Sequence, residues 1–172
     1  YAHEIGSKQC YERYGSFIAD ILNYIIEGRH PNLFIHNNGL LYSNGKERPI
    51  SWMNSMLNGA PVTPRSGYLV EINGLWDNAL KFAAQLFTEN NGDIALADRW
   101  NALADKSGAS FVSTFLNDYG YLFDYVDGNM TDWSVRPNML IAISLEYSPL
   151  DRRQRKGILD IVTKELLTPK GI

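Results

Sequence analysis

Apolar side chains recur at steps of three and four residues from residue 11 to residue 28, the spacing that places them along one face of an α-helix. They are Tyr14, Phe17, Ile18, Ile21, Leu22, Ile25 and Ile26. Ser7 is suited to cap the start of this helix, and Gly28 is suited to end it. The pattern therefore predicts one amphipathic helix near the beginning of the chain.

Residues 31–64 have no helical spacing and are rich in asparagine–glycine turn sequences. Short extended pieces are predicted at 33–35 and 40–42. Trp52 and Met53 argue against disorder, because large apolar side chains are rare in disordered segments. A long irregular connection inside a compact domain usually carries function, so this segment is a candidate for the site.

Helical spacing returns in the second half of the chain. Four further helices are predicted, at residues 72–87, 93–118, 137–145 and 148–164, with a strand at 121–126. The first of them is apolar nearly all round, so we expect it to be packed on both sides. Ser148 is expected to cap the last one. The whole pattern predicts an all-α fold of about five helices with long loops and at most a short β-hairpin.

Composition narrows the class of protein. The chain has 172 residues, 45% of them hydrophobic and 20% charged, which fits one globular domain. Sixteen Lys and Arg against nineteen Asp and Glu give a net charge of −3, and no basic run could follow a phosphate backbone. No apolar run is long enough to cross a membrane. We therefore expect neither a nucleic-acid nor a membrane partner.

Cysteine and histidine are too scarce for metal or disulfide chemistry. Cys10 is the single cysteine, and the three histidines follow no ligand spacing, so we expect no metal site and no cofactor. A lone cysteine fits a reducing compartment, and we expect a cytoplasmic protein. The chain begins without Met and stops just after a predicted helix, which suggests a fragment of something longer.

One stretch of loop and helix start carries side chains that suit a sugar. Trp52 offers a flat apolar face, and Arg65, Glu71 and Asn73 offer groups that bond hydroxyls. Arg65 follows Pro64 on a loop, where we expect it near solvent. An alternative is a plain helix N-terminus, with Glu71 favoured by the helix dipole and Arg65 paired to a nearby acid.

A second stretch, residues 121–138, concentrates carboxylates and aromatic rings. A calcium loop is excluded, because Gly128 at its glycine position would place Phe123 and Tyr125 where oxygen ligands belong. Turn carboxylates that bond local amides account for Asp127. Asp132 and Arg136 fit that account less well, since both lie just before a predicted helix, and they join the candidate site.

Several short motifs, taken in order, resemble the amylo-α-1,6-glucosidase domain of the glycogen debranching enzymes. They are Gly39-Leu40-Leu41-Tyr42, Ser51-Trp52-Met53-Asn54, Thr63-Pro64-Arg65, Val70-Glu71-Ile72-Asn73-Gly74-Leu75-Trp76, Arg136-Pro137-Asn138, Ser144-Leu145 and Leu166-Leu167-Thr168-Pro169. The resemblance implies an (α/α)6 barrel whose loops form the sugar site at one end. About five helices cannot close that barrel, so we expect residues 1–172 to be the central portion of one such domain.

The resemblance also implies roles for the candidate residues. The position of the family's general acid, an aspartate, is occupied here by Asn54, and an amide cannot donate the proton of a carboxylic acid. Trp52, Arg65, Glu71, Asn73, Asp132 and Arg136 correspond to substrate-binding positions. Asp77 stands where the family usually has tyrosine. An inverting glycosidase needs a second carboxylate roughly 6.5–9.5 Å from the first, and we expect that base beyond Ile172.

These observations predict a glycoside hydrolase fragment. The longer protein is expected to hydrolyse α-1,6 branch linkages of glycogen-like glucans with inversion by paired carboxylates, and the isolated chain is expected to be inactive. Asn54 keeps open a second hypothesis, a catalytically silent carbohydrate-binding or helical scaffold module. A helical toroid without a sugar ligand is a third. The expected partner is a branched glucan, with self-association through helix faces that an incomplete barrel leaves uncovered.

Overall fold

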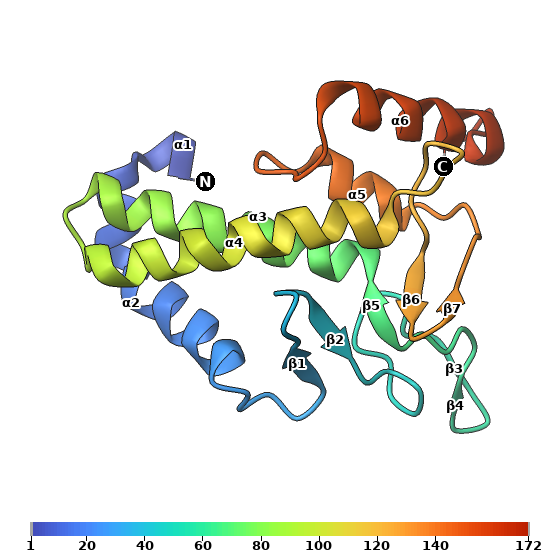
Figure 1. Cartoon of the computed structure of the whole chain (residues 1–172), viewed down its shortest axis with the longest axis horizontal. Helices are drawn as coiled ribbons and strands as arrows, with labels where there is room; N and C mark the ends of the chain where they lie inside the picture. The colour runs from blue at the N-terminus through green and yellow to red at the C-terminus, as the bar shows by residue number, and fades with distance from the viewer. Residues whose placement is uncertain (1, 172) are drawn as a thin grey trace.

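Two long helices form the centre of the molecule in the computed structural model, which describes residues 2–171. Helix α3 (Val70–Glu89) and helix α4 (Ile94–Phe115) lie side by side along the longest axis (Figure 1). Asp93 caps α4, because its side chain accepts a hydrogen bond from the backbone N–H of Leu96 at 3.0 Å. Both helices confirm the predicted ranges to within a few residues.

The N-terminal helix agrees with its predicted end but not with its predicted cap. Helix α2 (Ser7–Ile26) packs against α3 and follows the single turn α1 (Ala2–Ile5). Gly28, just beyond it, has φ 67°, the left-handed conformation that commonly ends a helix. Ser7 does not cap: it is the first helical residue, and its hydroxyl donates to Glu89 Oε2 at 2.6 Å.

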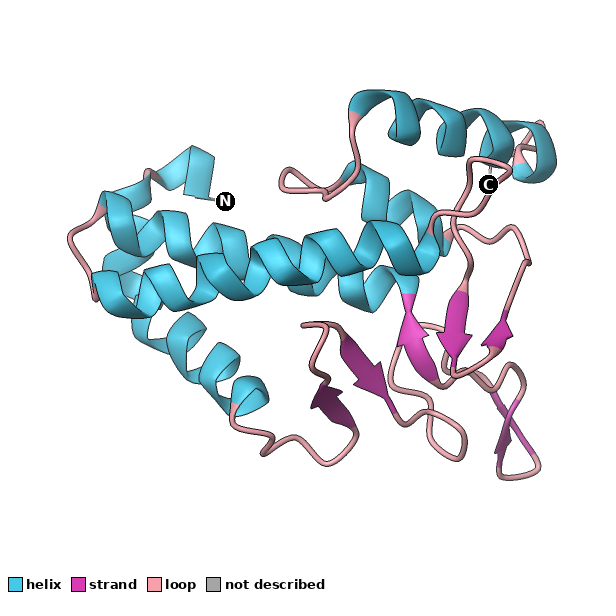
Figure 2. Cartoon of the chain, in the orientation of Figure 1, coloured by secondary structure: helices cyan, strands magenta, loops and turns pink. Residues whose placement is uncertain are grey.

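The expectation of an all-α fold needs correction, because the molecule also contains a five-stranded antiparallel sheet (Figure 2). Its order is β1 (Leu33–Ile35), β2 (Leu41–Ser43), β5 (Gly67–Leu69), β6 (Tyr125–Asp127) and β7 (Met130–Thr131), and a separate hairpin pairs β3 (Met56–Leu57) with β4 (Ala60–Pro61). The extended pieces predicted at 33–35 and 40–42 correspond to β1 and β2, and the strand predicted at 121–126 overlaps β6. The pairing of such short strands into one sheet has no signal in the sequence.

Strand β5 continues directly into α3, and Gly67 allows β5 to lie close to β6. Gly67 has φ 93°, and a Cβ there would lie 2.2 Å from the carbonyl oxygen of Val126 on β6. Only glycine tolerates both conditions. The close approach brings the start of α3 and the segment before β6 together, and the candidate site lies where they meet.

The C-terminal part is helical. Helix α5 (Asn138–Ser144) follows Pro137, as predicted, and helix α6 (Arg152–Leu166) is the last element. The prediction that Ser148 caps the last helix is wrong, because Asp151 forms a capping box with Gln154. The side chain of Ser148 instead accepts a hydrogen bond from Leu150 N at 3.4 Å within the preceding turn.

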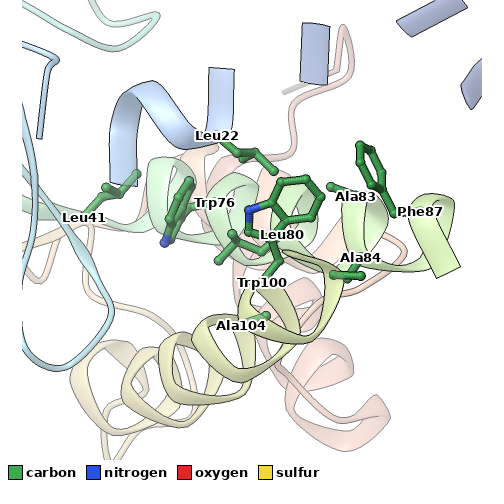
Figure 3. Packing of buried hydrophobic residues seen from close by; sticks show 10 residues of the cluster. Leu22, Leu41, Trp76, Leu80, Ala83, Ala84, Phe87, Trp100 and Ala104 are labelled. Carbon is green, nitrogen blue, oxygen red and sulfur yellow. The ribbon is translucent and has the colours of Figure 1, made fainter. Parts of the chain in front are cut away.

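Two hydrophobic clusters stabilise the helices. In the first, Trp76 and Leu80 of α3 pack with Leu22 of α2 and Trp100 of α4 (Figure 3). In the second, Phe111 and Phe115 of α4 pack with Met139 of α5 and Ile158 of α6. Helix α3 also packs against α5, which confirms the prediction that it is covered on more than one side.

Two surface properties bear on the expected partners. Helix α2 exposes large apolar side chains at helical spacing, namely Tyr14, Phe17, Ile21 and Tyr24. Within residues 2–171, none of the helices combines the length and the apolar character that crossing a membrane requires.

Candidate functional site

A buried ion pair forms the base of the candidate site. Arg65, in the loop between β4 and β5, donates from Nη1 to Glu71 Oε1 at 2.5 Å and from Nη2 to Glu71 Oε2 at 2.8 Å. Arg65 is 4% exposed and Glu71 1%. The expectation that Arg65 lies near solvent is therefore wrong. Its contacts are those of the alternative, an arginine paired to a nearby acid.

Asp124, which the sequence analysis did not select, lies at the centre of the cluster. Its carboxylate is fully buried and follows the turn that leads into β6. Oδ2 lies 2.8 Å from Arg65 Nε and accepts a hydrogen bond from Arg136 Nη1 at 2.7 Å. Oδ1 accepts a hydrogen bond from Asn138 Nδ2 at 2.6 Å. One carboxylate thus joins a loop, the segment before α5 and the first residue of α5.

Arg136 and Asp132 form the outer part of the cluster. Arg136 Nη1 donates to Asp132 Oδ2 at 2.8 Å as well as to Asp124. Asp132 Oδ1 also accepts a hydrogen bond from the backbone N–H of Ser134 at 2.7 Å. The side chains of Arg136 and Asp132 retain 24% and 17% of their accessible surface. This pair is therefore the polar part of the cluster that a ligand can reach.

Trp52 and Asn54 lie on the exposed loop that borders the cluster. Trp52 is 58% exposed, and its Nε1–H donates to Asn138 Oδ1 at 2.8 Å. Asn54 is exposed, and its backbone N–H donates to the carbonyl oxygen of Trp52 at 3.0 Å. Trp52 therefore presents an aromatic face to solvent, with Asn54 two residues away.

Asn73 has a different environment from the other candidates. It is fully buried, and its amide donates to the carbonyl oxygens of Leu41 and Leu69 at 3.0 Å each. Its Oδ1 accepts a hydrogen bond from Leu41 N at 2.8 Å. Asn73 thus connects α3 to strands β2 and β5, and its side-chain hydrogen bonds go to the backbone of these strands.

Comparison with known proteins gives the family. The family model described as amylo-alpha-1,6-glucosidase matches residues 1–172, the whole chain. The chain belongs to the amylo-alpha-1,6-glucosidase family. A search of curated proteins found no match. Membership confirms the resemblance to the glycogen debranching enzymes and makes this a glycoside hydrolase-related, glycogen debranching-related domain.

Burial and charge have opposite effects on the pKa values at the centre of the candidate site. Burial raises the pKa of Asp124, and the opposing effects of Arg65, Asn138 and Arg136 are smaller. For Arg65, in contrast, the neighbouring charges outweigh burial. Burial alone would lower its pKa, but the hydrogen bond and charge of Glu71, together with Asp124, raise it above its usual value. The guanidinium therefore stays charged and tied to its two acids.

The accessible carboxylate, Asp132, is suited to bind rather than to donate a proton. Partial burial would raise its pKa, but hydrogen bonds from Ser134 and Arg136 lower it below the usual value. A general acid needs a pKa near the working pH, so an ionised Asp132 does not meet that need. Glu71 and Asp124 are closed to solvent. Among residues 2–171, no group of three or more His, Cys, Asp or Glu side chains is arranged to hold a metal ion.

The structure thus joins most of the predicted residues, through two that sequence reasoning missed. Trp52, Arg65, Glu71, Asp132 and Arg136 form one hydrogen-bonded cluster only because Asp124 and Asn138 link them. Asn138 stands in the Arg-Pro-Asn motif, and Asp124 stands between aromatic residues before a strand. These positions in the sequence are the signals that could have pointed to the two residues.

Proposed function

We propose that this chain carries part of the sugar-binding site of an α-1,6-glucosidase and that the longer protein removes α-1,6-linked glucose from branched, glycogen-like glucans. The observation that carries the proposal is the exposed Trp52 side chain, held beside Asn54 and linked through Asn138 and Asp124 to the Arg136–Asp132 pair. Membership of the amylo-alpha-1,6-glucosidase family supports the substrate class.

We assign each side chain a role in binding according to its exposure. Trp52 stacks on a sugar ring, because its flat apolar face is open to solvent. Asp132 accepts hydrogen bonds from sugar hydroxyls, and Arg136 donates them. Arg65, Glu71 and Asn73 are buried, so we assign them the role of holding the loop, α3 and the sheet in place around the ligand.

The chemistry we propose for the longer protein is inversion by paired carboxylates. One carboxylic acid protonates the glycosidic oxygen, and a carboxylate on the other side activates water. The acid position is Asn54 in this chain, whose amide does not titrate in the working range. We therefore propose that residues 1–172 alone do not hydrolyse glucan, and that they form part of an (α/α)6 barrel whose general base lies elsewhere in the protein.

A silent binding module is the second candidate, and Asn54 favours it. The two candidates differ in what Asn54→Asp does in the longer protein. For an enzyme weakened at this position, the variant gains glucose release from a branched oligosaccharide. For a silent module, neither form releases glucose. A variant that is less active than the original would show that the acid lies elsewhere.

The buried free thiol of Cys10 supports placing the protein in the cytoplasm, where thiols stay reduced. This placement is tested by fractionating cells that express the longer protein. Recovery in an oxidising compartment would contradict it.

The binding proposal is tested by calorimetry on this chain with a maltooligosaccharide that carries one α-1,6-linked glucose. Trp52→Ala removes the stacking face, and we expect the affinity to fall by at least about tenfold, since stacking and burial of an aromatic ring are worth more than about 1.4 kcal/mol. Phe17→Ala is the matched control, because Phe17 is 62% exposed on α2, whereas Trp52 is 58% exposed in the site. Equal affinity in both variants would contradict the proposal.

A further inference from the structure

The exposed ring of the candidate site is attached to a buried partner. Trp52 lies at residues 51–55, a segment without helix or strand, where the backbone alone does not fix a side chain. Its single polar atom nevertheless donates at 2.8 Å to Asn138, which is 0% exposed. A ring that is open on one face is thus held at its edge from inside the molecule.

The orientation of the Asn138 amide follows from its other contacts. The NH2 group donates to Asp124 Oδ1 at 2.6 Å and to Met53 Sδ at 3.2 Å. A carboxylate only accepts, so the NH2 group must face Asp124 and the carbonyl oxygen must face Trp52. Donors and acceptors therefore match from Trp52 through Asn138 to Asp124. A flipped Asn138 amide would lose its hydrogen bonds to both Trp52 and Asp124.

Asp124 is fixed in turn, and it serves both exposed parts of the site. Arg65 Nε lies 2.8 Å from its Oδ2, and Arg65 is itself paired to Glu71 in the first turn of α3. The same Oδ2 accepts a hydrogen bond from Arg136 at 2.7 Å. Asp124 therefore links Trp52, through Asn138 on its Oδ1, to Arg136 on its Oδ2.

We propose that Asn138 and Asp124 are positioning residues that hold the Trp52 ring, at a set distance from the Arg136–Asp132 pair, for a glucosyl unit of the glucan. This inference rests on the proposed function, since it assumes that Trp52 stacks on sugar. It adds that the preformed ring orientation, rather than the aromatic surface alone, gives the affinity.

The test combines glucan affinity with a signal from Trp52 itself. The ligand is the maltooligosaccharide with one α-1,6-linked glucose, and the indole N–H signal of Trp52 is assigned in ¹⁵N NMR spectra by its loss in Trp52→Phe. In Asn138→Ala we expect the dissociation constant to rise about tenfold, as for one lost hydrogen bond. We also expect the Trp52 signal to exchange faster with water, while those of the buried Trp76 and Trp100 stay unchanged.

Asn117→Ala is the matched control, because it removes another buried amide, one that accepts a hydrogen bond from Tyr119 N at 2.9 Å in a different turn. We expect it to lower stability without changing the Trp52 signal or the affinity.

A second variant, Asn138→Asp, keeps an oxygen for Trp52 but faces Asp124 with another carboxyl. Repulsion should weaken binding about tenfold at about pH 7.5, and a shared proton should restore it at about pH 5.

The outcomes distinguish the proposed sugar-binding function from the positioning role of Asn138 and Asp124. If Trp52→Ala weakens binding but a folded Asn138→Ala binds within about twofold of the original, the positioning role is overturned and the proposed function stands. If Asn138→Ala does not fold, binding by Asn138→Asp that is unchanged between the two pH values overturns it instead. If Trp52→Ala leaves the affinity unchanged, the proposed function fails, and the positioning role fails with it.

Discussion

Replacing Asp77 by asparagine should stabilise the protein at neutral pH. Asp77 lies on α3 with its carboxylate fully buried, and neither oxygen has a hydrogen-bond partner among the described residues. The ammonium of Lys81 lies 3.5 Å from Oδ2. On the facing helix, Gly108 is so close that a Cβ there would lie 3.2 Å from Asp77 Oδ1. The carboxylate thus faces helix α4 at close range.

The size of the expected gain in stability follows from the pKa of Asp77. Burial raises the pKa of Asp77 from 3.8 to about 6, although Lys81 opposes the shift. Because the folded protein holds the proton more tightly, its stability is full below about pH 4 and decreases as the pH rises through about 6. This rise in the pKa, from 3.8 to about 6, corresponds to a stability difference of about 3 kcal/mol. Asp77→Asn cannot ionise, so it should gain about that much at pH 7.5 and almost nothing near pH 4.

Urea denaturation followed by circular dichroism at both pH values measures the gain. Asp98→Asn, at an exposed position on α4, is the control and should change the free energy of unfolding by less than about 0.5 kcal/mol. The reasoning is refuted if Asp77→Asn is no more stable than the original at pH 7.5. It is also refuted if the gain is equally large at pH 4, because the effect would then not come from ionisation.

Three further predictions concern the loop, the sheet and the exposed helix. Arg65→Lys should lose about 3 kcal/mol of unfolding free energy in urea titrations, because a single ammonium cannot replace the buried two-bond pair with Glu71; a loss below about 0.5 kcal/mol would contradict this. Gly67→Ala should cost at least about 2 kcal/mol more than Gly59→Ala, since both glycines have positive φ but only Gly67 lies against β6; equal thermal melting of the two variants would contradict it. The apolar row on α2 should cause self-association in sedimentation experiments, reduced by Phe17→Ser; a monomer at high concentration would contradict this.

The long helices could be predicted from the sequence because their spacing extends over many turns. Helices α3 and α4 each present a continuous series of apolar positions, and Asp93 and the asparagine–glycine sequence before it mark their boundary. The start of the last helix was predicted too early, because Ser148 before Pro149 has the form of a cap followed by a first helical residue. The helix begins at Arg152, after the capping box that Asp151 forms with Gln154.

The pairing of the strands into a sheet and the centre of the candidate site could not be predicted, because both depend on distant segments. The pairing of β5 with β6 joins residue 68 to residue 126. Arg65 is buried only because Glu71 and Asp124 meet it from two other segments, so its position beside a proline gave no sign of burial. Residue types in loops selected the exposed part of the candidate site, and the links through Asp124 and Asn138 appeared only in the fold.

The central claim is that the Trp52 loop and the Arg136–Asp132 pair bind a branched glucan. The most direct measurement is an NMR titration of this chain with the maltooligosaccharide that carries one α-1,6-linked glucose. The account predicts that the largest chemical-shift changes occur at the Trp52 indole, the Asn54 amide and the Arg136 guanidinium, while the α2 signals around Phe17 stay in place. Saturable changes confined to α2, or no changes at millimolar ligand, would contradict it.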